Sequence, residues 1–343
     1  MNKLFEVQAF DDGYADSKSK CRGSEVYVTP SYVTTWRPQY DTNLASEERS
    51  PLSRIELEVS GRQYLVGEAA VHQDKELQWN GSDDKHADYN FDILLNTHLG
   101  LMSQNTKSGI VRLVMGLPVK TSLDVKRVEV LRQKTIGQHE FSIKLANDTD
   151  FKKKTVYVED VIIKAQTHGT LCDLVLDDVG RLADKSTAKK MVAISDIGGK
   201  THNMYVVEAL DPIADYCDTT SNGMYTAYGW VKDWIYDKWK LKLSDSQMQT
   251  VIGHKEIKGY DITPIITQSY EQLARNIIVE LKTKWDSAFS FIEEIVFTGG
   301  GSTVLKPYLM KEFMRAKYFD QAKNVTGFLK QGIREWIFKT SAA

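Results

Sequence analysis

The chain has 343 residues, of which 42% are hydrophobic and 26% are charged, and its formal net charge is -2. This length favours about two domains, and the composition excludes a disordered chain. A charge so close to zero gives no long-range attraction to DNA or to an anionic membrane, so we expect neither as a direct partner.

The first 70 residues contain mostly strand signals, because Val, Tyr and Thr are frequent and apolar and polar residues alternate. We expect strands at residues 4–10, 25–33, 54–60 and 63–67. The polar segments 36–50 and 77–88 lack any period and are expected to form exposed loops.

The middle of the chain alternates helices and strands. We expect a helix at 91–102, strands at 110–115 and 156–165, a polar connection at 147–154 and a helix at 171–182. A buried strand at 191–195 then pairs with residues 202–208 as a hairpin.

The C-terminal half is more helical. A cap at residues 221–223 predicts a helix that reaches Trp239. At Thr263-Pro264 a hydroxyl cap followed by proline at the first helical position predicts a second helix with one apolar face. A strand at 294–297 and a helix at 304–313 follow.

The cysteines and the apolar segments bear on the cellular compartment. Cys21, Cys172 and Cys217 are the three cysteines, and no two form a CxxC pair. An odd number without such spacing favours a reducing compartment over a disulfide scaffold. We find no signal peptide at residues 1–10 and no apolar run long enough to span a bilayer, so we expect a cytoplasmic protein.

Three glycine segments each follow an apolar, strand-like run. They are Asp11-Asp12-Gly13, Asp196-Ile197-Gly198-Gly199 and Thr298-Gly299-Gly300-Gly301. A strand that ends in Asp-x-Gly presents a carboxylate, which can hold the water shell of Mg²⁺, and then a backbone that can approach an anion closely. Two such turns facing each other, with the third under a base and a sugar, predict an ATP cleft between two domains.

Each turn taken alone is also typical of an ordinary hairpin or strand–helix connection. The tripeptide Gly199-Lys200-Thr201 is similar to the end of a P-loop, but that motif needs a glycine five residues before Gly199. Ile194 stands there, inside the expected strand, which argues against a P-loop. The repeated order of apolar strand, Asp-x-Gly, turn and strand indicates duplicated domains.

The three turns, in this order, resemble the actin-like ATPase superfamily, which includes actin, bacterial actin homologues, sugar kinases and heat-shock chaperone ATPases. Within it the chain is most similar to ParM-type plasmid-segregation actins. That likeness also rests on residues 66–70, 115–119 and 321–328. The resemblance implies an α/β, actin-like (ribonuclease H-like) fold of duplicated domains with an ATP cleft between them. Residues 1–188 would form domain I and 189–322 domain II, with 323–343 returning to domain I.

The resemblance also implies roles for individual residues. Asp11 and Asp196 would act in catalysis by holding Mg²⁺ through water. The phosphates of ATP, or of GTP, would contact Gly13, Tyr14, Lys18, Gly198, Gly199, Lys200 and Thr201. The adenosine end would lie on Gly299, Gly300 and Gly301.

The water-positioning residue of ParM-like chains lies on the helix that links the domains. Gln166, thirty residues before Asp196, is our candidate. ParM proteins often carry a glutamate and a proline there, and this chain has neither. A neutral amide can still orient water, as glutamine does in small GTPases.

The leading functional prediction is a Mg²⁺-dependent ATPase that polymerises into filaments. It would segregate plasmid DNA through a ParR-like adaptor bound to a centromere-like site, without touching DNA or membrane itself. The alternatives are a small-molecule kinase and a non-polymerising, chaperone-like ATPase of the same superfamily. Sugar-dependent ADP release would favour the kinase, and a protein that stays monomeric with ATP would favour the chaperone-like ATPase.

Overall fold

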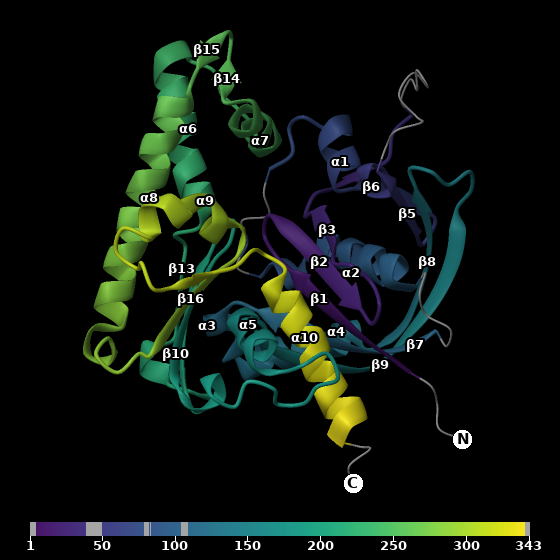
Figure 1. Cartoon of the computed structure of the whole chain (residues 1–343). Coiled ribbons are helices and arrows are strands. Elements are labelled where there is room, and N and C mark those ends of the chain that lie inside the picture. Colours follow the sequence, from purple (N-terminus) through teal and green to yellow (C-terminus); the bar gives the residue numbers. More distant parts are fainter. Residues whose placement is uncertain (1–4, 39–49, 79–81, 83, 104–108, 340–343) are drawn as a thin grey trace.

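Two β-sheets lie side by side, each flanked by helices (Figure 1). The computed structural model describes residues 5–38, 50–78, 82, 84–103 and 109–339. Within these ranges, no helix combines the length and the apolar character needed to cross a bilayer.

The first sheet has nine strands among the described residues, in the order β3-β2-β1-β7-β9-β8-β5-β6-β4. They are β1 (Glu6–Asp12), β2 (Asp16–Cys21), β3 (Tyr27–Pro30), β4 (Val33–Thr35), β5 (Ile55–Val59), β6 (Arg62–Val66), β7 (Ile110–Leu117), β8 (Gly137–Leu145) and β9 (Lys152–Ala165). Its helices are α1 (Glu68–Gln73), α2 (Tyr89–Met102), α3 (Val119–Ser122) and α4 (Val125–Thr135). Successive residues of β1 face opposite sides, so Phe10 joins the core beside α2 while Val7 and Ala9 face the other way.

The second sheet runs in the order β12-β11-β10-β16-β17, with β13 also paired to β11. Its strands are β10 (Met191–Ile197), β11 (His202–Glu208), β12 (Asp211–Pro212), β13 (Asp218–Thr220), β16 (Glu294–Thr298) and β17 (Lys317–Tyr318). One face packs on α6 (Met224–Trp239), α8 (Thr263–Lys284) and α9 (Gly300–Leu309), and the other on α5 (Gln166–Val175). The helix α7 (Asp245–His254) and the hairpin β14 (Glu256–Ile257) and β15 (Tyr260–Asp261) lie at the far end of α6 and α8 (Figure 1).

The two sheets repeat one local arrangement. β1 pairs antiparallel with β2 and parallel with β7, and β10 pairs antiparallel with β11 and parallel with β16. Asp11 and Asp196 are each the penultimate residue of their strand. The two carboxylates therefore occupy equivalent places in the two sheets.

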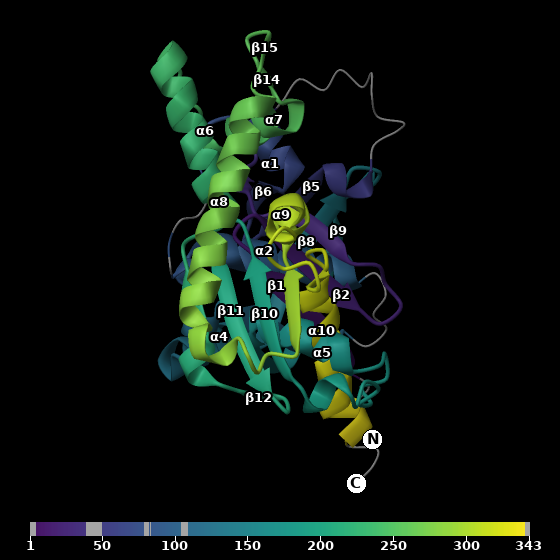
Figure 2. The same cartoon turned by 60° about the vertical axis from the view of Figure 1, so that its left-hand side comes forward.

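The chain returns to the first sheet at α10 (Lys323–Ile333). Phe328 of α10 is fully buried and belongs to the cluster that contains Val7 and Ala9 of β1. α5 and α10 lie next to each other in both views (Figure 2). They meet at Gly169 and Gly327, where a Cβ on either residue would collide with the backbone of the other helix.

Replacing Phe328 with alanine should lower the free energy of unfolding by about 3–5 kcal/mol, because it leaves a cavity between α10 and the first sheet. Urea denaturation followed by circular dichroism measures this change. The matched control is Phe291→Ala, since that side chain is 70% exposed and its loss leaves no cavity. Equal stabilities for the two variants would contradict this account of the packing.

Three expected elements were wrong in their extent. The polar connection expected at 147–154 is shorter, because β9 begins at Lys152. The strand expected at 25–33 is split into β3 and β4, because the chain turns after Pro30 and the Tyr32 N–H donates to the Pro30 carbonyl at 2.8 Å. The helix expected at 171–182 is α5, which begins earlier and ends at Val175. Residues 176 and 182 instead form a β-bridge around a turn in which Gly180 has a φ of +78.

Helix starts also differ from the expectation. Ile262, rather than Thr263, is the N-cap of α8, and the Thr263 N–H donates to Asp261 Oδ1 at 2.8 Å. The helix expected at 304–313 begins at Gly300, because the glycine turn itself forms the first helical turn. The elements α4, β8 and α7 were not anticipated. Most of the loop expected at 36–50, and residues 79–81 and 83 of the loop at 77–88, lie outside the described residues.

Candidate functional site

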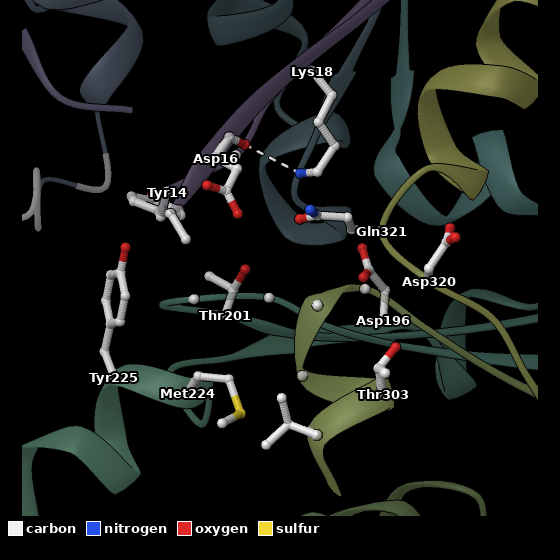
Figure 3. A pocket seen from close by; sticks show the side chains of 18 of the residues that line it. Tyr14, Asp16, Lys18, Asp196, Thr201, Met224, Tyr225, Thr303, Asp320 and Gln321 are labelled. Carbon is white, nitrogen blue, oxygen red and sulfur yellow. Dashed lines mark hydrogen bonds between the residues drawn. The ribbon is translucent and has the colours of Figure 1, made fainter. Parts of the chain in front are cut away.

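The ends of β1, β10 and β16 open onto one cavity of about 530 Å³ (Figure 3). The predicted site residues that line it are Asp11, Gly13, Tyr14, Lys18, Gln166, Asp196, Gly198, Gly199, Thr201, Gly299, Gly300 and Gly301. Lys200 is not among the lining residues; its Nζ lies 4.9 Å from the centroid of the Tyr14 ring. Three turns that are far apart in the sequence thus meet at one place.

The first turn joins β1 to β2. Lys18 stands directly opposite Asp11 in this pair, so the two side chains share one face of the sheet. Lys18 Nζ lies 3.9 Å from Asp11 Oδ2 and donates to the Asp16 carbonyl at 3.1 Å. A side chain at Gly13 would collide with the same carbonyl, so the turn requires glycine there.

The second turn joins β10 to β11 and is held by the start of α6. Its carbonyls accept the first N–H groups of that helix, which would otherwise lack a partner. The pairs are Gly198 with Met224 (3.0 Å), Gly199 with Tyr225 (2.8 Å) and Lys200 with Gly223 (3.0 Å). Because the C=O and N–H of a trans peptide point in opposite directions, the N–H groups of Gly199 and Thr201 face away from α6. Backbone donors arranged in this way can hold an anion.

The third turn packs directly on the second. Gly299 has a φ of +89, and a Cβ there would collide with Asp196 Oδ1. A Cβ at Gly301 would collide with the side chain of Ile197. Glycine at both positions therefore allows α9 to begin against the carboxylate of the second sheet.

Two buried aspartates lie at the base of the cavity. Asp11 and Asp196 are 2% and 5% exposed. Burial, and then the charge of Asp11, raise the pKa of Asp196 to about 6, although Asn324 Nδ2 donates to Asp196 Oδ2 at 3.0 Å. A divalent cation at this place would offset the repulsion between the two carboxylates.

The donor set fits Mg²⁺ better than a metal that needs a complete protein cage. Across the described residues, no group of three or more His, Cys, Asp or Glu side chains could hold a metal ion. Mg²⁺ usually keeps several waters and binds one or two carboxylates together with phosphate oxygens. Two carboxylates beside glycine turns match that requirement.

Gln166 begins α5 and is 8% exposed. Its Nε2 donates to Asp11 Oδ1 at 2.9 Å, and its Oε1 accepts from Asn203 Nδ2 at 3.4 Å. Because both ends of the amide are hydrogen-bonded, the orientation of the Gln166 side chain is fixed relative to any water that lies beside it.

The sequence interpretation missed two asparagines at the base of the cavity. Asn203 stands opposite Asp196 in the β10–β11 pair, and its Oδ1 accepts from the Val119 N–H at 3.2 Å. Asn324 bonds Asp196 from α10. The position of Asn203 follows from the predicted hairpin, whereas Asn324 lies in the segment 321–328 that carries the family likeness but was given no role at the cavity.

The sequence interpretation also missed the residues that three helices contribute to the cavity. They come from α6, α7 and α9, and are Met224, Tyr225, Tyr228, Gln249, Ile252, Gly253, Thr303 and Val304. Their spacing within each helix marks no site by itself, so only the packing of the three helices brings them together.

Two family models match the sequence. The model of the N-terminal domain of actin-like proteins matches residues 9–169, and the model of the C-terminal part of archaeal MreB-like actin homologues matches residues 194–311. The first range contains Asp11 and Gln166, and the second contains Asp196 and the triple glycine. The chain is actin-like. Among curated proteins, no significant match is found.

Solved structures share the actin-like fold over nearly the whole length. A non-polymerisable quadruple mutant of pCBH ParM is 21% identical with a TM-score of 0.78, over 96% of this chain and 99% of that one. ParM in a 15-stranded filament from Clostridium botulinum is 20% identical with a TM-score of 0.77, over the same shares. An archaeal actin homologue in complex with ADP is 14% identical with a TM-score of 0.70, over 98% of this chain and 100% of that one. The predicted α/β, actin-like fold and the likeness to ParM are confirmed.

Proposed function

We propose that the actin-like chain binds and hydrolyses Mg²⁺-ATP, or Mg²⁺-GTP, in this cavity and polymerises into filaments. One observation carries the proposal: Asp11 and Asp196 come from two different sheets and lie buried at the same cavity, each beside a glycine turn. Such a pair between backbone donors suits a metal ion bound to a chain of phosphates.

The lining residues divide into three parts. Asp11 and Asp196 would hold the water shell of Mg²⁺, which when bound offsets the charge of the phosphates. The first two turns and Lys18 would contact the phosphates. Tyr225 of α6 and Ile252 of α7 also line the cavity and would offer apolar surface to a base.

Gln166 would direct the attacking water. Transfer of a phosphoryl group to water needs positioning and charge neutralisation rather than a covalent intermediate. The Gln166 amide is already bonded to Asp11 and Asn203, so its orientation costs no reorganisation during the reaction.

Nucleotide binding would stabilise the approach of the two halves, and this closed form would polymerise. Ser246 Oγ of α7 already donates to the Lys75 carbonyl at 2.9 Å, across the two halves of the chain. We assign residues 1–188 and 323–343 to one domain and 189–322 to the other. The ParM likeness and the net charge of -2 support plasmid segregation in the cytoplasm through a ParR-like adaptor rather than direct DNA binding.

Sedimentation and electron microscopy test the proposal. The purified protein is mixed with Mg²⁺-ATP, with Mg²⁺-ADP, or with ATP and a chelator, and phosphate release is recorded in parallel. We expect filaments to pellet with Mg²⁺-ATP and phosphate to appear as they form. A protein that hydrolyses ATP but never sediments would contradict polymerisation and favour the kinase or chaperone-like alternative. A protein that binds no nucleotide would contradict the whole proposal.

A further inference from the structure

A chain of three hydrogen-bonded side chains supports the second turn from the face of the β10–β11 hairpin that does not carry Asp196. Ser195 Oγ and His202 Nε2 are 2.9 Å apart, and His202 Nδ1 lies 2.9 Å from Glu280 Oε2. Ser195 and His202 are both fully buried. Glu280 belongs to α8, so this chain connects the β10–β11 hairpin to the longest helix among the described residues.

The hairpin has two functional faces. Asp196 and Asn203 are cross-strand partners and share the face that lines the cavity. Ser195 and His202 lie on the other face, because side chains alternate along each strand. His202 is also the first residue of β11 after Thr201, so fixing its ring fixes the end of the second turn.

Glu280 binds more than His202. Its carboxylate also accepts from Thr220 Oγ1 at 3.1 Å and from Asn222 Nδ2 at 2.5 Å. Burial alone would raise the pKa of the Glu280 carboxyl, but the hydrogen bonds from His202, Asn222 and Thr220 outweigh it and hold the pKa below its usual range. The carboxylate is therefore the shared acceptor of three donors.

Two of these contacts, from His202 and from Asn222, connect Glu280 to the second turn. Asn222 directly precedes Gly223, the N-cap of α6. The N–H groups of this cap and of the first two residues of α6 donate to the carbonyls of Gly198, Gly199 and Lys200. Glu280 thus supports the turn from both sides: through His202 at the start of β11, and through Asn222 at the start of α6.

A serine, a histidine and a carboxylate in this order also form the triad of many hydrolases. Here Ser195 is 0% exposed and lies in the middle of a paired strand, so no substrate can reach its hydroxyl. The hydrogen bonds orient the His202 ring instead. Because the Glu280 carboxylate accepts from His202 Nδ1–H, Nε2 is left to accept from the Ser195 hydroxyl.

We propose that Glu280 is a positioning residue that, through His202 and Asn222, holds the second glycine turn in the shape that binds the nucleotide phosphates. This inference rests on the proposed function. Because Glu280 is not among the residues that line the cavity, it acts on binding without touching the ligand.

The test compares Glu280→Ala and Glu280→Gln with the full-length protein. Removing hydrogen bonds to a charged group should weaken binding of a non-hydrolysable ATP analogue with Mg²⁺ by about tenfold or more in Glu280→Ala. Glu280→Gln keeps one acceptor for His202 and should recover part of that loss. Glu271→Gln, on the exposed side of α8 near Lys311, is the matched control and should bind as the unmodified protein does.

Two further readouts separate positioning from a merely structural role. NMR of the nucleotide-free protein should show a hydrogen-bonded Nδ1 proton of His202 that disappears in Glu280→Ala. Melting temperatures report any general loss of stability, and binding is measured well below the lowest of them.

The outcomes are distinct. If the unmodified protein binds the analogue and Glu280→Ala binds it equally tightly, the positioning role is overturned while the proposed function stands. If Glu280→Gln is as impaired as Glu280→Ala although its His202 proton persists, positioning through His202 is overturned. If the unmodified protein binds no nucleotide, the proposed function fails and this inference fails with it.

Discussion

An Asp196→Asn variant is expected to release phosphate from Mg²⁺-ATP at least about a hundredfold more slowly than the unmodified protein, with its fold intact. Asparagine keeps the shape of the side chain, and its Oδ1 can still accept the hydrogen bond from Asn324. It carries no negative charge, so it holds the water shell of Mg²⁺ far less well. Phosphate release at saturating Mg²⁺-ATP measures the effect. An unchanged rate would remove Asp196 from the mechanism.

The same variant should be more stable without nucleotide. The pKa of Asp196 is raised from 3.8 to about 6, so the folded state holds the proton more tightly than the unfolded state does. Protonated Asp196 therefore favours folding at low pH. This stabilisation is lost as the pH rises from about 4 to about 6, and above this range the ionised Asp196 lowers the free energy of unfolding by about 3 kcal/mol. The substituted asparagine does not titrate and avoids this cost.

Thermal melting across this pH range supplies the control. Near neutral pH the variant should melt at a higher temperature than the unmodified protein, and the difference should shrink as the pH falls toward 4. Asp178→Asn removes a carboxylate whose side chain is 96% exposed and should leave the melting temperature unchanged. A variant that melts below the unmodified protein near neutral pH would show that the Asp196 charge stabilises the empty fold.

A Gln166→Ala variant is expected to hydrolyse ATP about a hundredfold more slowly and to form longer-lived filaments. The methyl group cannot orient water, and both the bond to Asp11 and the bond to Asn203 are lost. Affinity for Mg²⁺-ATP should change little, because the phosphates would contact the turns rather than the amide. Single-turnover phosphate release and filament disassembly after dilution measure the two effects.

Gln272→Ala on α8 is the control for this substitution. The Gln272 side chain bonds only its helix neighbours Arg275 and Asn276, among the described contacts. It should hydrolyse ATP and disassemble at the rates of the unmodified protein. If Gln166→Ala did the same, another group would have to direct the water.

The local chemistry of the three turns was predictable because contiguous residues carry it. An apolar strand followed by Asp-x-Gly needs only its own neighbours to be recognised, and the hairpin expected from 191–195 and 202–208 is the observed pair of β10 and β11. The meeting of the turns at one cavity was predicted from all three turns taken together, with the support of their likeness to a known family, rather than from any single motif.

The parts that could not be predicted depend on packing between distant segments. Asn324 reaches Asp196 only because α10 returns to the first sheet, and Glu280 reaches His202 only because α8 crosses behind the second. Thr263 was expected to cap α8, but it is the first residue of the helix: Ile262 is the N-cap, and Asp261 Oδ1 accepts from the Thr263 N–H. Lys200 was expected to contact the phosphates; its Nζ lies 4.9 Å from the centroid of the Tyr14 ring, and the phosphate contact stays a prediction.

The contact between Gly169 and Gly327 has a mechanical consequence. At that point no side chain separates the two helices, while Asp173 of α5 pairs with Lys323 and Lys330 of α10 and ties the helices together. Gln166 lies one helical turn from this contact on α5, and Asn324 lies one turn from it on α10. A shift of one helix against the other would therefore also move these carboxamides relative to the aspartates they bind, so the close contact helps to keep both catalytic halves aligned.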